Sequence, residues 1–233
     1  MTTFIKIISK KEFERENEKP KQEEVWDNIA DSWKEYRARE IPIVAEFLKN
    51  KKGKVADLGC GTGRNMIKND KIEYYGVDFS ERMIKNAEKF IKTNKINAKL
   101  FKSRADNLSL FPDEMFDYGL FIAALHCLET PEEREDALKE FYRILKKNAE
   151  ALISVWDSED KRFNGLKGDI YMGWKENNIV HMRYYYLYDK KELIDLLENV
   201  GFKVLEIYAA REKDRFSRKN LIIRIRKYKQ LRN

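Results

Sequence analysis

The feature that most constrains this chain is a short apolar run that ends in an acid and continues into three alternating glycines, at residues 54–66 (KVADLGCGTGRNM). The apolar run predicts a buried parallel strand with Asp57 at its carboxyl end, where ligands of open α/β sheets bind. Gly59, Gly61 and Gly63 allow a tight turn and a close approach of the backbone to a ligand. A dinucleotide site needs the spacing G-x-G-x-x-G, whereas this segment has D-x-G-x-G-x-G. The pattern therefore favours a ligand that carries an ammonium group and no phosphate.

Three further segments place acidic residues near the ends of predicted strands. Glu73–Phe79 forms an apolar strand that reaches Asp78, and a carboxylate there can accept hydrogen bonds from both hydroxyls of a ribose. The strand Ala98–Ser103 leads into Asp106, and Met115–Ala123 forms a fourth strand. Because the carboxyl ends of parallel strands meet at one edge of a sheet, these residues outline a single crevice.

In this order and spacing, the motifs resemble those of the class I S-adenosylmethionine-dependent methyltransferases. The resemblance implies that the glycine loop holds the methionine part of S-adenosylmethionine, that Asp78 binds the ribose and that the Ala105-Asp106 pair lies at the adenine. The cofactor-binding residues implied in this way are Asp57, Gly59, Cys60, Gly61, Gly63, Asp78, Phe79, Ala105, Asp106 and Ile122. Within the loop, Cys60 is expected to be a small packing residue and not a nucleophile.

Helix signals follow in the second half of the chain. Thr130 and Glu133 form a capping box with proline at the first helical position, and Asp189 and Glu192 form a second box. The second helix is expected to end at Gly201. These two segments are therefore predicted to be helices that flank a sheet.

Further strands complete the sheet. Ala151–Trp156 is a predicted fifth strand, and Phe202–Tyr208 and Leu221–Arg226 alternate as two final strands, expected to form a hairpin at the sheet edge. The predicted fold is α/β, a Rossmann-like, doubly wound, seven-stranded, mainly parallel sheet with an antiparallel last strand. Helices are expected between each pair of the first five strands.

Two segments stand outside this plan. Residues 1–22 are highly charged and are expected to form an N-terminal arm or a peripheral helix, so that the methyltransferase domain spans 23–233. Residues 157–182 contain three glycines and no clear periodicity. A loop of that length in a compact domain is usually functional or disordered, so it is expected to be a substrate-side insertion that forms a wall or lid.

Composition limits the class of protein. The chain has 233 residues, enough for one large α/β core. Its two cysteines and two histidines have neither a disulfide framework nor metal-ligand spacing, so no metal site is expected. No apolar run could cross a membrane, and the N-terminus lacks a signal-peptide pattern. We expect a soluble, intracellular protein of the cytoplasm with no membrane partner.

The excess positive charge lies at the C-terminal end. Residues 201–233 contain eleven Lys and Arg against three acids, whereas the remainder of the chain is close to neutral. Such a block suggests an anionic partner, with nucleic acid ahead of membrane because no amphipathic anchor accompanies it. The alternative is a solvated strand pair with a frayed basic tail.

A narrower resemblance appears outside the cofactor motifs. Residues 25–30 (VWDNIA), Arg37 and the segment 183–188 (RYYYLY) resemble the tRNA wobble-uridine carboxyl methyltransferases, which methylate the carboxylate of 5-carboxymethyluridine. The family has His-His-Trp where this chain has His126-Cys127-Leu128, and an aromatic pair of which Phe216 remains. The resemblance implies tRNA as a partner, together with a small zinc-containing activator protein in a heterodimer.

The chemistry implied by this resemblance needs few groups. A carboxylate acceptor is already ionised at neutral pH, so no general base is required and catalysis depends on alignment and desolvation. A cation should orient the carboxylate. The candidate catalytic residues are Arg37, His126 and Arg183.

Each candidate has a competing interpretation. Arg37 follows a predicted N-terminal helix and could contact the carboxylate of the cofactor, which also makes it a cofactor-site candidate, or lie on the surface. His126 could be a packing histidine at the end of the fourth strand. Arg183 and the tyrosines that follow could bind or stack on a flipped-out base, but Tyr184–Tyr186 could equally form a core strand.

Three functions therefore remain open from the residues. The first is a tRNA carboxyl methyltransferase, and the second is a methyltransferase that acts on a small molecule or a protein. The third is a non-catalytic subunit of the same fold that binds RNA or acts as a scaffold. The intact acids and glycines of the cofactor motifs argue against the third, because a scaffold does not need them.

Overall fold

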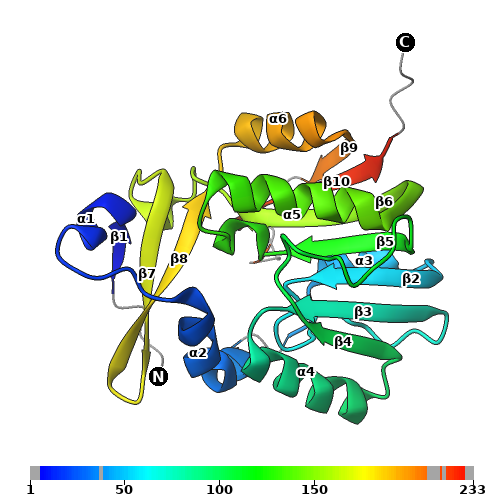
Figure 1. Cartoon of the computed structure of the whole chain (residues 1–233), viewed down its shortest axis with the longest axis horizontal. Coiled ribbons are helices and arrows are strands. Elements are labelled where there is room, and N and C mark those ends of the chain that lie inside the picture. Colours follow the sequence, from blue (N-terminus) through cyan, green and yellow to red (C-terminus); the bar gives the residue numbers. More distant parts are fainter. Residues whose placement is uncertain (1–5, 37–38, 209–215, 217–218, 229–233) are drawn as a thin grey trace.

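A computed structural model of the chain describes residues 6–36, 39–208, 216 and 219–228, and it contains two sheets. The larger sheet has seven strands in the order β4-β3-β2-β5-β6-β10-β9, and only β10 runs antiparallel to its neighbours (Figure 1). In chain order its strands are β2 (Gly53–Leu58), β3 (Ile72–Asp78), β4 (Ala98–Lys102), β5 (Phe116–Ile122), β6 (Leu145–Trp156), β9 (Phe202–Tyr208) and β10 (Asn220–Lys227). The predicted fold class is confirmed. The expected final hairpin is confirmed at the sheet edge, with β10 between β6 and β9 and β9 outermost.

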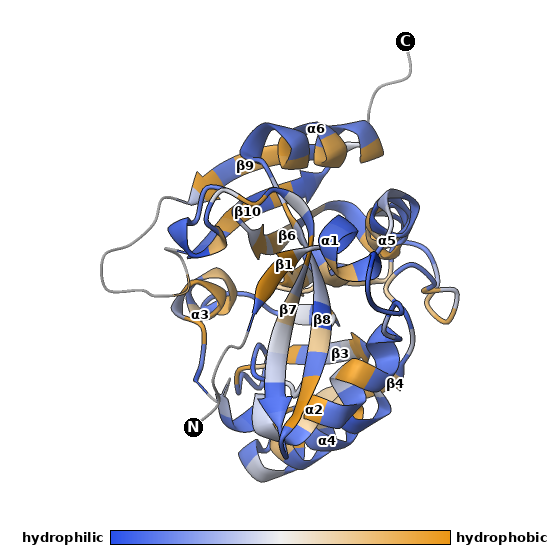
Figure 2. Ribbon diagram, turned by 90° about the vertical axis from the view of Figure 1, so that its left-hand side faces the viewer, coloured by the Kyte–Doolittle hydropathy of each residue, from blue (hydrophilic) through white to orange (hydrophobic). Residues whose placement is uncertain are grey.

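Helices cover both faces of this sheet, as expected for a doubly wound fold. They are α3 (Pro42–Leu48), α4 (Glu81–Asn94), α5 (Pro131–Ile144) and α6 (Lys190–Val200). Side chains alternate along each strand, so Val55 packs in the cluster with α3 while Ala56 packs in the cluster with α5 and α6. Figure 2 shows the sheet between α3 on one side and α5 on the other.

The expected helices are missing from two of the four connections between the first five strands. Residues 59–71 and 103–115 contain no helix. In the first connection, the Tyr74 hydroxyl donates to the carbonyl of Ile67 at 2.9 Å and accepts from its N–H at 3.2 Å. In the second, the Arg143 guanidinium donates to the carbonyls of Leu108 and Phe111. Side chains of neighbouring elements thus satisfy backbone groups that a helix would otherwise pair.

A second, three-stranded sheet is formed by β1 (Ile7–Ser9), β7 (Gly168–Glu176) and β8 (Ile179–Leu187), in the order β1-β7-β8. The described part of the expected charged arm is therefore ordered, with β1 paired to β7 and the short helix α1 (Lys10–Glu14) following it. Residues 157–182, expected as a loop, contain the 3-10 turn η2 (Lys161–Phe163), β7 and the start of β8. Below, this smaller sheet is called the outer sheet.

Helix α2 (Gln22–Tyr36) joins the two sheets. One face packs with the outer sheet, where Trp26 and Ile29 share an apolar cluster with Ile170 and Trp174, and the same cluster includes Met83 of α4. Figure 1 shows α2 between the outer sheet and α4. Among the described residues, no helix is long and apolar enough to cross a membrane.

Part of the basic C-terminal block is engaged within the fold. Arg224 pairs with Glu206 of β9, and Arg226 pairs with Glu150 of β6. The buried Lys227 ammonium donates to the carbonyls of Arg143 and Leu145. Six of the eleven basic residues lie outside the part of the chain that the structure describes.

Candidate active site

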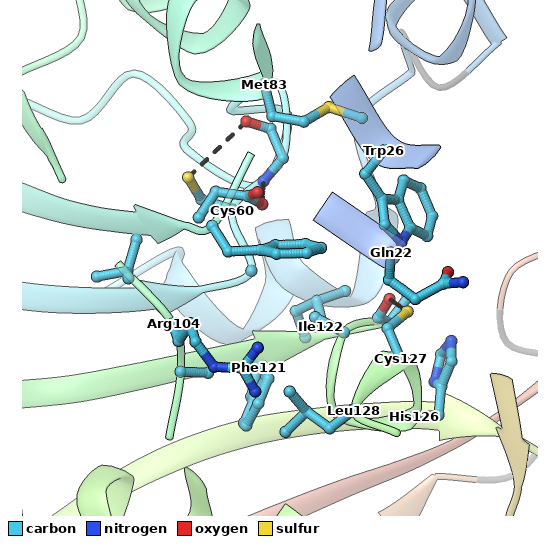
Figure 3. Close-up of a pocket in the computed structure, with 18 of the residues that line it drawn as sticks. Gln22, Trp26, Cys60, Met83, Arg104, Phe121, Ile122, His126, Cys127 and Leu128 are labelled. Carbon is cyan, nitrogen blue, oxygen red and sulfur yellow. Dashed lines mark hydrogen bonds between the residues drawn. The ribbon is translucent and has the colours of Figure 1, made fainter. Parts of the chain in front are cut away.

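A cleft opens at the carboxyl ends of β2, β3 and β5, with α2 on its far side. It encloses about 1160 Å³ of empty space, part of which is open to solvent. In Figure 3, Cys60 and Arg104 lie on one side, Gln22 and Trp26 of α2 on the other, and His126 at one end. This is the position in which open α/β sheets bind ligands.

The glycine loop lines the cleft in the conformation that its sequence predicts. Gly59, Gly61 and Gly63 have φ values of 63°, 53° and 88°, in the left-handed region that favours glycine. A Cβ on Gly59 would lie 2.2 Å from the Cβ of Ala124, whereas a Cβ on Gly61 would meet no atom within 4 Å. The backbone at Gly61 therefore faces open space, which leaves room for a ligand to approach it.

Asp57 is fully buried beneath this loop. Its Oδ1 accepts a hydrogen bond from the Asn65 amide at 3.1 Å, and its Oδ2 has no partner among the described residues. Burial raises the pKa of Asp57 to about 7, against the lowering effect of Asn65. Asp57 is not in contact with the cleft itself. It can act on the cofactor ammonium only through the loop or through water.

Asp78 does line the cleft, at the end of β3. Its Oδ2 accepts from the Gly61 N–H at 2.8 Å, and its Oδ1 accepts from the Ser80 N–H at 3.0 Å. Burial raises the pKa of Asp78 to about 6, partly offset by these hydrogen bonds. Each carboxylate oxygen keeps a second lone pair for a ribose hydroxyl, so the geometry fits the role that the sequence suggested.

Three further residues expected at the cofactor, Phe79, Ala105 and Ile122, line the cleft. Asp106, expected with Ala105 at the adenine, does not line it. The Asp106 carboxylate instead binds the Arg104 guanidinium in a two-point contact, with N···O distances of 2.7–3.2 Å. Arg104 also bonds Glu133 at 2.7 Å, and both Arg104 and Glu133 line the cleft. Asp106 therefore orients Arg104 at the edge of the site.

Cys60 lines the cleft, and its thiol donates to the carbonyl of Gly61 at 3.8 Å. Burial raises the pKa of this thiol well above its usual range. It therefore remains protonated, in keeping with a packing role.

His126 lies in the turn η1 (Leu125–Cys127), directly after β5, and lines the cleft although it is 1% exposed. Its Nδ1 accepts from the N–H of Trp156 at 3.2 Å, so the neutral ring carries its proton on Nε2. The ring also stacks on Trp156, with centroids 5.1 Å apart. These two contacts fix the orientation of the ring.

Arg183 of β8 is completely buried, one layer behind the cleft wall. Its Nη1 donates to the Tyr185 hydroxyl at 2.7 Å. Its Nε and Nη2 have no hydrogen-bond partner within the described ranges. The guanidinium is surrounded by the rings of Trp26, Trp33, Trp174 and Tyr185, at 4.9–5.9 Å. Burial lowers the pKa of Arg183, but a guanidinium stays charged in proteins. Below, this group is called the Arg183 cage.

Three walls of the cage also line the cleft, namely Trp26, Trp33 and Tyr185. The two tryptophans therefore contribute both to the apolar interior around Arg183 and to the surface of the cleft. In the sequence, the signal for this arrangement is the separation of the two tryptophans by seven residues, which places both on the same face of a helix. Arg37, the remaining candidate, lies outside the described residues.

Comparison with known proteins shows that this chain is similar to methyltransferases. Residues 55–148 match a family described as "Methyltransferase domain". A tRNA (carboxymethyluridine(34)-5-O)-methyltransferase from Schizosaccharomyces pombe is 30% identical over 225 residues, which cover 84% of this chain and 93% of that protein. A probable tRNA methyltransferase 9B from Mus musculus is 31% identical over 64% of this chain, but the matched part is only 32% of its own length.

Among solved structures, one chain from the complex between the Haloferax volcanii Trm112 methyltransferase activator and a putative methyltransferase has a similar fold. Its TM-score is 0.68 at 16% identity, covering 91% of this chain and all of that one. At this identity the likeness shows the fold.

The sheet order, the glycine loop and the acid that closes it are those of a class I methyltransferase, an enzyme that uses S-adenosylmethionine as its methyl donor. The Gly61 backbone facing open space and the unsatisfied lone pairs of Asp78 fit that cofactor. The similarity to the Schizosaccharomyces pombe enzyme extends over nearly the full length of both chains. The chain belongs to the tRNA (carboxymethyluridine(34)-5-O)-methyltransferase family.

Proposed function

We propose that this protein transfers a methyl group from S-adenosylmethionine to the carboxylate of 5-carboxymethyluridine at the wobble position of tRNA. A carboxylate acceptor is supported by Arg183, which lies behind the cleft wall. It is a buried cation that has no carboxylate partner among the described residues. The name of the Schizosaccharomyces pombe relative supports the same acceptor, and that of the Mus musculus relative supports tRNA as the substrate.

The energetics of the Arg183 cage favour an anionic ligand. Removing a guanidinium from water costs several kcal/mol, and a desolvated cation–π contact contributes about 2 kcal/mol. The four rings can therefore offset much of this cost, but they leave Nε and Nη2 without a hydrogen-bond acceptor among the described residues. Because Arg183 lies behind the cleft wall, a ligand carboxylate would meet it through the Tyr185 hydroxyl, which accepts from Nη1 and can donate its own proton to the ligand, and the negative charge would balance that of the guanidinium.

The remaining residues have supporting roles in this proposal. Bound S-adenosylmethionine would supply an electrophilic methyl group on a sulfonium. The acceptor carboxylate is ionised at neutral pH, so no residue has to remove a proton. Asp78 and the glycine loop would hold the cofactor. His126 would donate from Nε2 to the uridine, and the outer sheet would serve as the substrate side. Arg37 remains a candidate contact to either carboxylate.

The test measures where a labelled methyl group goes. The protein is incubated with labelled cofactor and with tRNA that carries carboxymethyluridine, and a tRNA transcript with unmodified uridine serves as the control. We expect label in the first tRNA alone. Label that enters a protein or metabolite fraction and never the tRNA would support the second function, methylation of another acceptor.

Two variants test the role of Arg183. Arg183→Met keeps much of the side-chain volume and removes the cation, so we expect a loss of methyl transfer of at least tenfold while the Kd for S-adenosylhomocysteine changes less than twofold. Tyr185→Phe should produce the same loss if the hydroxyl relays the contact, and a smaller one if Arg183 binds the carboxylate directly. Full activity in Arg183→Met would remove this residue from the mechanism.

We also propose a heterodimer with a small zinc-containing activator protein, acting in the cytoplasm. Its support is the resemblance of this chain to the family and the complex with an activator seen for a protein of the same fold. Co-expression with an activator should raise methyl transfer to tRNA, and metal analysis of the purified pair should find zinc. A pair that fails to co-purify, with full activity of the single chain, would contradict this part.

A further inference from the structure

Asp27 is one of the acids that fasten helix α2 to α4. The Asp27 Oδ1 accepts hydrogen bonds from the Ser80 hydroxyl at 2.5 Å and from the Arg82 N–H at 3.1 Å. Ser80 is the N-cap of α4, and its own N–H donates to Asp78. Asp27 therefore supplies a second cap to α4 from another helix, where a negative charge is stabilised by the helix dipole, and it acts on the segment that carries Asp78.

The opposite face of α2 is fastened to the outer sheet. The Gln22 amide accepts from the Tyr184 N–H at 2.9 Å and donates to the Met182 carbonyl at 3.3 Å, which pairs the free edge of β8. The Ser32 hydroxyl donates to Glu176 at 2.6 Å and accepts from the Trp174 indole at 3.0 Å. These contacts hold α2 against the strands that carry Arg183.

The position of α2 therefore affects two sites together. Trp26 and Trp33 line the cofactor cleft and also form two walls of the Arg183 cage. Trp26 is the immediate neighbour of Asp27 in the chain, so its ring lies next to the contact between α2 and α4.

We propose that Asp27 is a positioning residue for the methyl-transfer site. By capping α4 beside Ser80, it holds Trp26 over the cofactor cleft, whereas Ser32 holds the same helix against the outer sheet. The role of Asp27 lies in cofactor binding and is independent of which acceptor is methylated. The role of Ser32 rests on the acceptor proposed above.

The test compares two acids of the same helix. Asp31 also docks α2 on α4, through Arg82 and Asn86 at 2.9 Å, but it does not contact Ser80. Asp27→Ala should raise the Kd for S-adenosylhomocysteine roughly tenfold, because a protein that holds Trp26 in its binding position only about a tenth of the time binds about tenfold more weakly. Asp27→Asn keeps an acceptor oxygen, so its Kd should lie between that of Asp27→Ala and that of the parent protein.

Asp31→Asn is the matched control. It should lower the melting temperature about as much as Asp27→Asn does and leave the Kd within twofold. Equal effects of the two variants on the Kd would reduce Asp27 to a docking contact and overturn the proposal, as would an unchanged Kd in both Asp27 variants. Binding is measured well below each melting temperature, so loss of folding is not mistaken for loss of affinity.

Ser32→Ala separates this inference from the proposed function. It should leave the Kd for S-adenosylhomocysteine within twofold and raise the KM for carboxymethyluridine tRNA several-fold with little change in kcat. If the parent protein fails to methylate that tRNA, the proposed function fails, but the comparison of Asp27 with Asp31 is unaffected. A weaker Kd in Ser32→Ala would contradict the division of roles between the two faces of α2.

Discussion

At the scale of single residues, the site contains two buried carboxyl groups with raised pKa values, about 7 for Asp57 and about 6 for Asp78. Both lie under or beside the glycine loop, and burial is the largest cause of both shifts. Buried acids with perturbed pKa values cluster at functional sites. Two predictions follow from the direction of these shifts.

The first concerns the stability of the cofactor-free protein. Because the pKa of Asp57 is higher in the folded state than its ordinary 3.8, the folded state binds a proton more tightly between about pH 4 and 7. Ionisation of Asp57 therefore lowers stability as pH rises through that window. Asp57→Asn should be more stable than the parent protein at pH 8, by roughly 1–3 kcal/mol, and the gap should shrink by pH 5.

Urea denaturation at the two pH values measures this gap. Asp195→Asn, a change of an exposed acid on α6 that pairs with Lys191, is the control and should change the stability only slightly. A gap for Asp57→Asn that is the same at pH 5 and pH 8 would show that the carboxyl group is not the cause.

The second concerns cofactor affinity. A ribose hydroxyl donates to the ionised form of Asp78, so protonation of Asp78 competes with binding. The Kd for S-adenosylhomocysteine should rise as pH falls through about 6, approaching tenfold per pH unit for one proton. Calorimetry from pH 8 to pH 5 measures it. Asp78→Asn should bind weakly with a flatter profile, and a flat profile in the parent protein would refute the assignment.

At the scale of elements, the structure of the glycine loop distinguishes Gly59 from Gly61, which the sequence alone does not. Gly59→Ala would force a Cβ to within 2.2 Å of Ala124, whereas Gly61→Ala adds its methyl group to open space. Both changes strain a residue with positive φ. We expect Gly59→Ala to lower the melting temperature clearly more than Gly61→Ala does. Gly61→Ala should fold and lose most of its affinity for the cofactor, because its methyl group lies where the ligand approaches.

Thermal melts and calorimetry on the two variants decide the matter. If Gly61→Ala binds S-adenosylhomocysteine as tightly as the parent protein, the open space at Gly61 is not the cofactor position.

Local signals in the sequence predicted some elements accurately. Both capping boxes are present, at Thr130 and at Asp189, and α6 ends at Gly201 with φ of 109°. These succeed because a cap is made by residues three or four positions apart. β7 could not be recognised in this way, because consecutive residues from Ile170 to Trp174 are buried and leave no alternation.

Long-range contacts account for the rest of what sequence could not supply. The absence of a helix at 59–71 depends on the Tyr74 hydroxyl, which arrives from β3. The burial of Arg183 depends on three tryptophans from α2 and β7. The identity of the cofactor residues was accessible because strand ends and glycines fall in fixed order, whereas the Arg183 cage assembles from segments far apart in the chain.

At the scale of the whole molecule, some basic residues of the C-terminal block contribute to the fold, because they pair with acids of neighbouring strands. Because Arg226 is paired with Glu150 across β10 and β6, it should contribute little to tRNA binding. We expect Arg226→Gln to leave the slope of log affinity against log salt unchanged, whereas loss of a phosphate contact would flatten the slope by about 0.7–0.9. Binding of tRNA across a salt series measures it, and a flatter slope would place Arg226 on the RNA.

The position of β10 has a consequence for how the protein is made. Strands β6 and β9 have no pairing with each other, and the residues that join them, 220–227, are translated after both. During synthesis, β2 to β6 can assemble before β10 is translated, and until then the edge of β6 that pairs with β10 stays unpaired. Such an edge invites association with other chains. Completion of the sheet is therefore a late event in synthesis, and the interval before it is when a nascent chain is most exposed to aggregation.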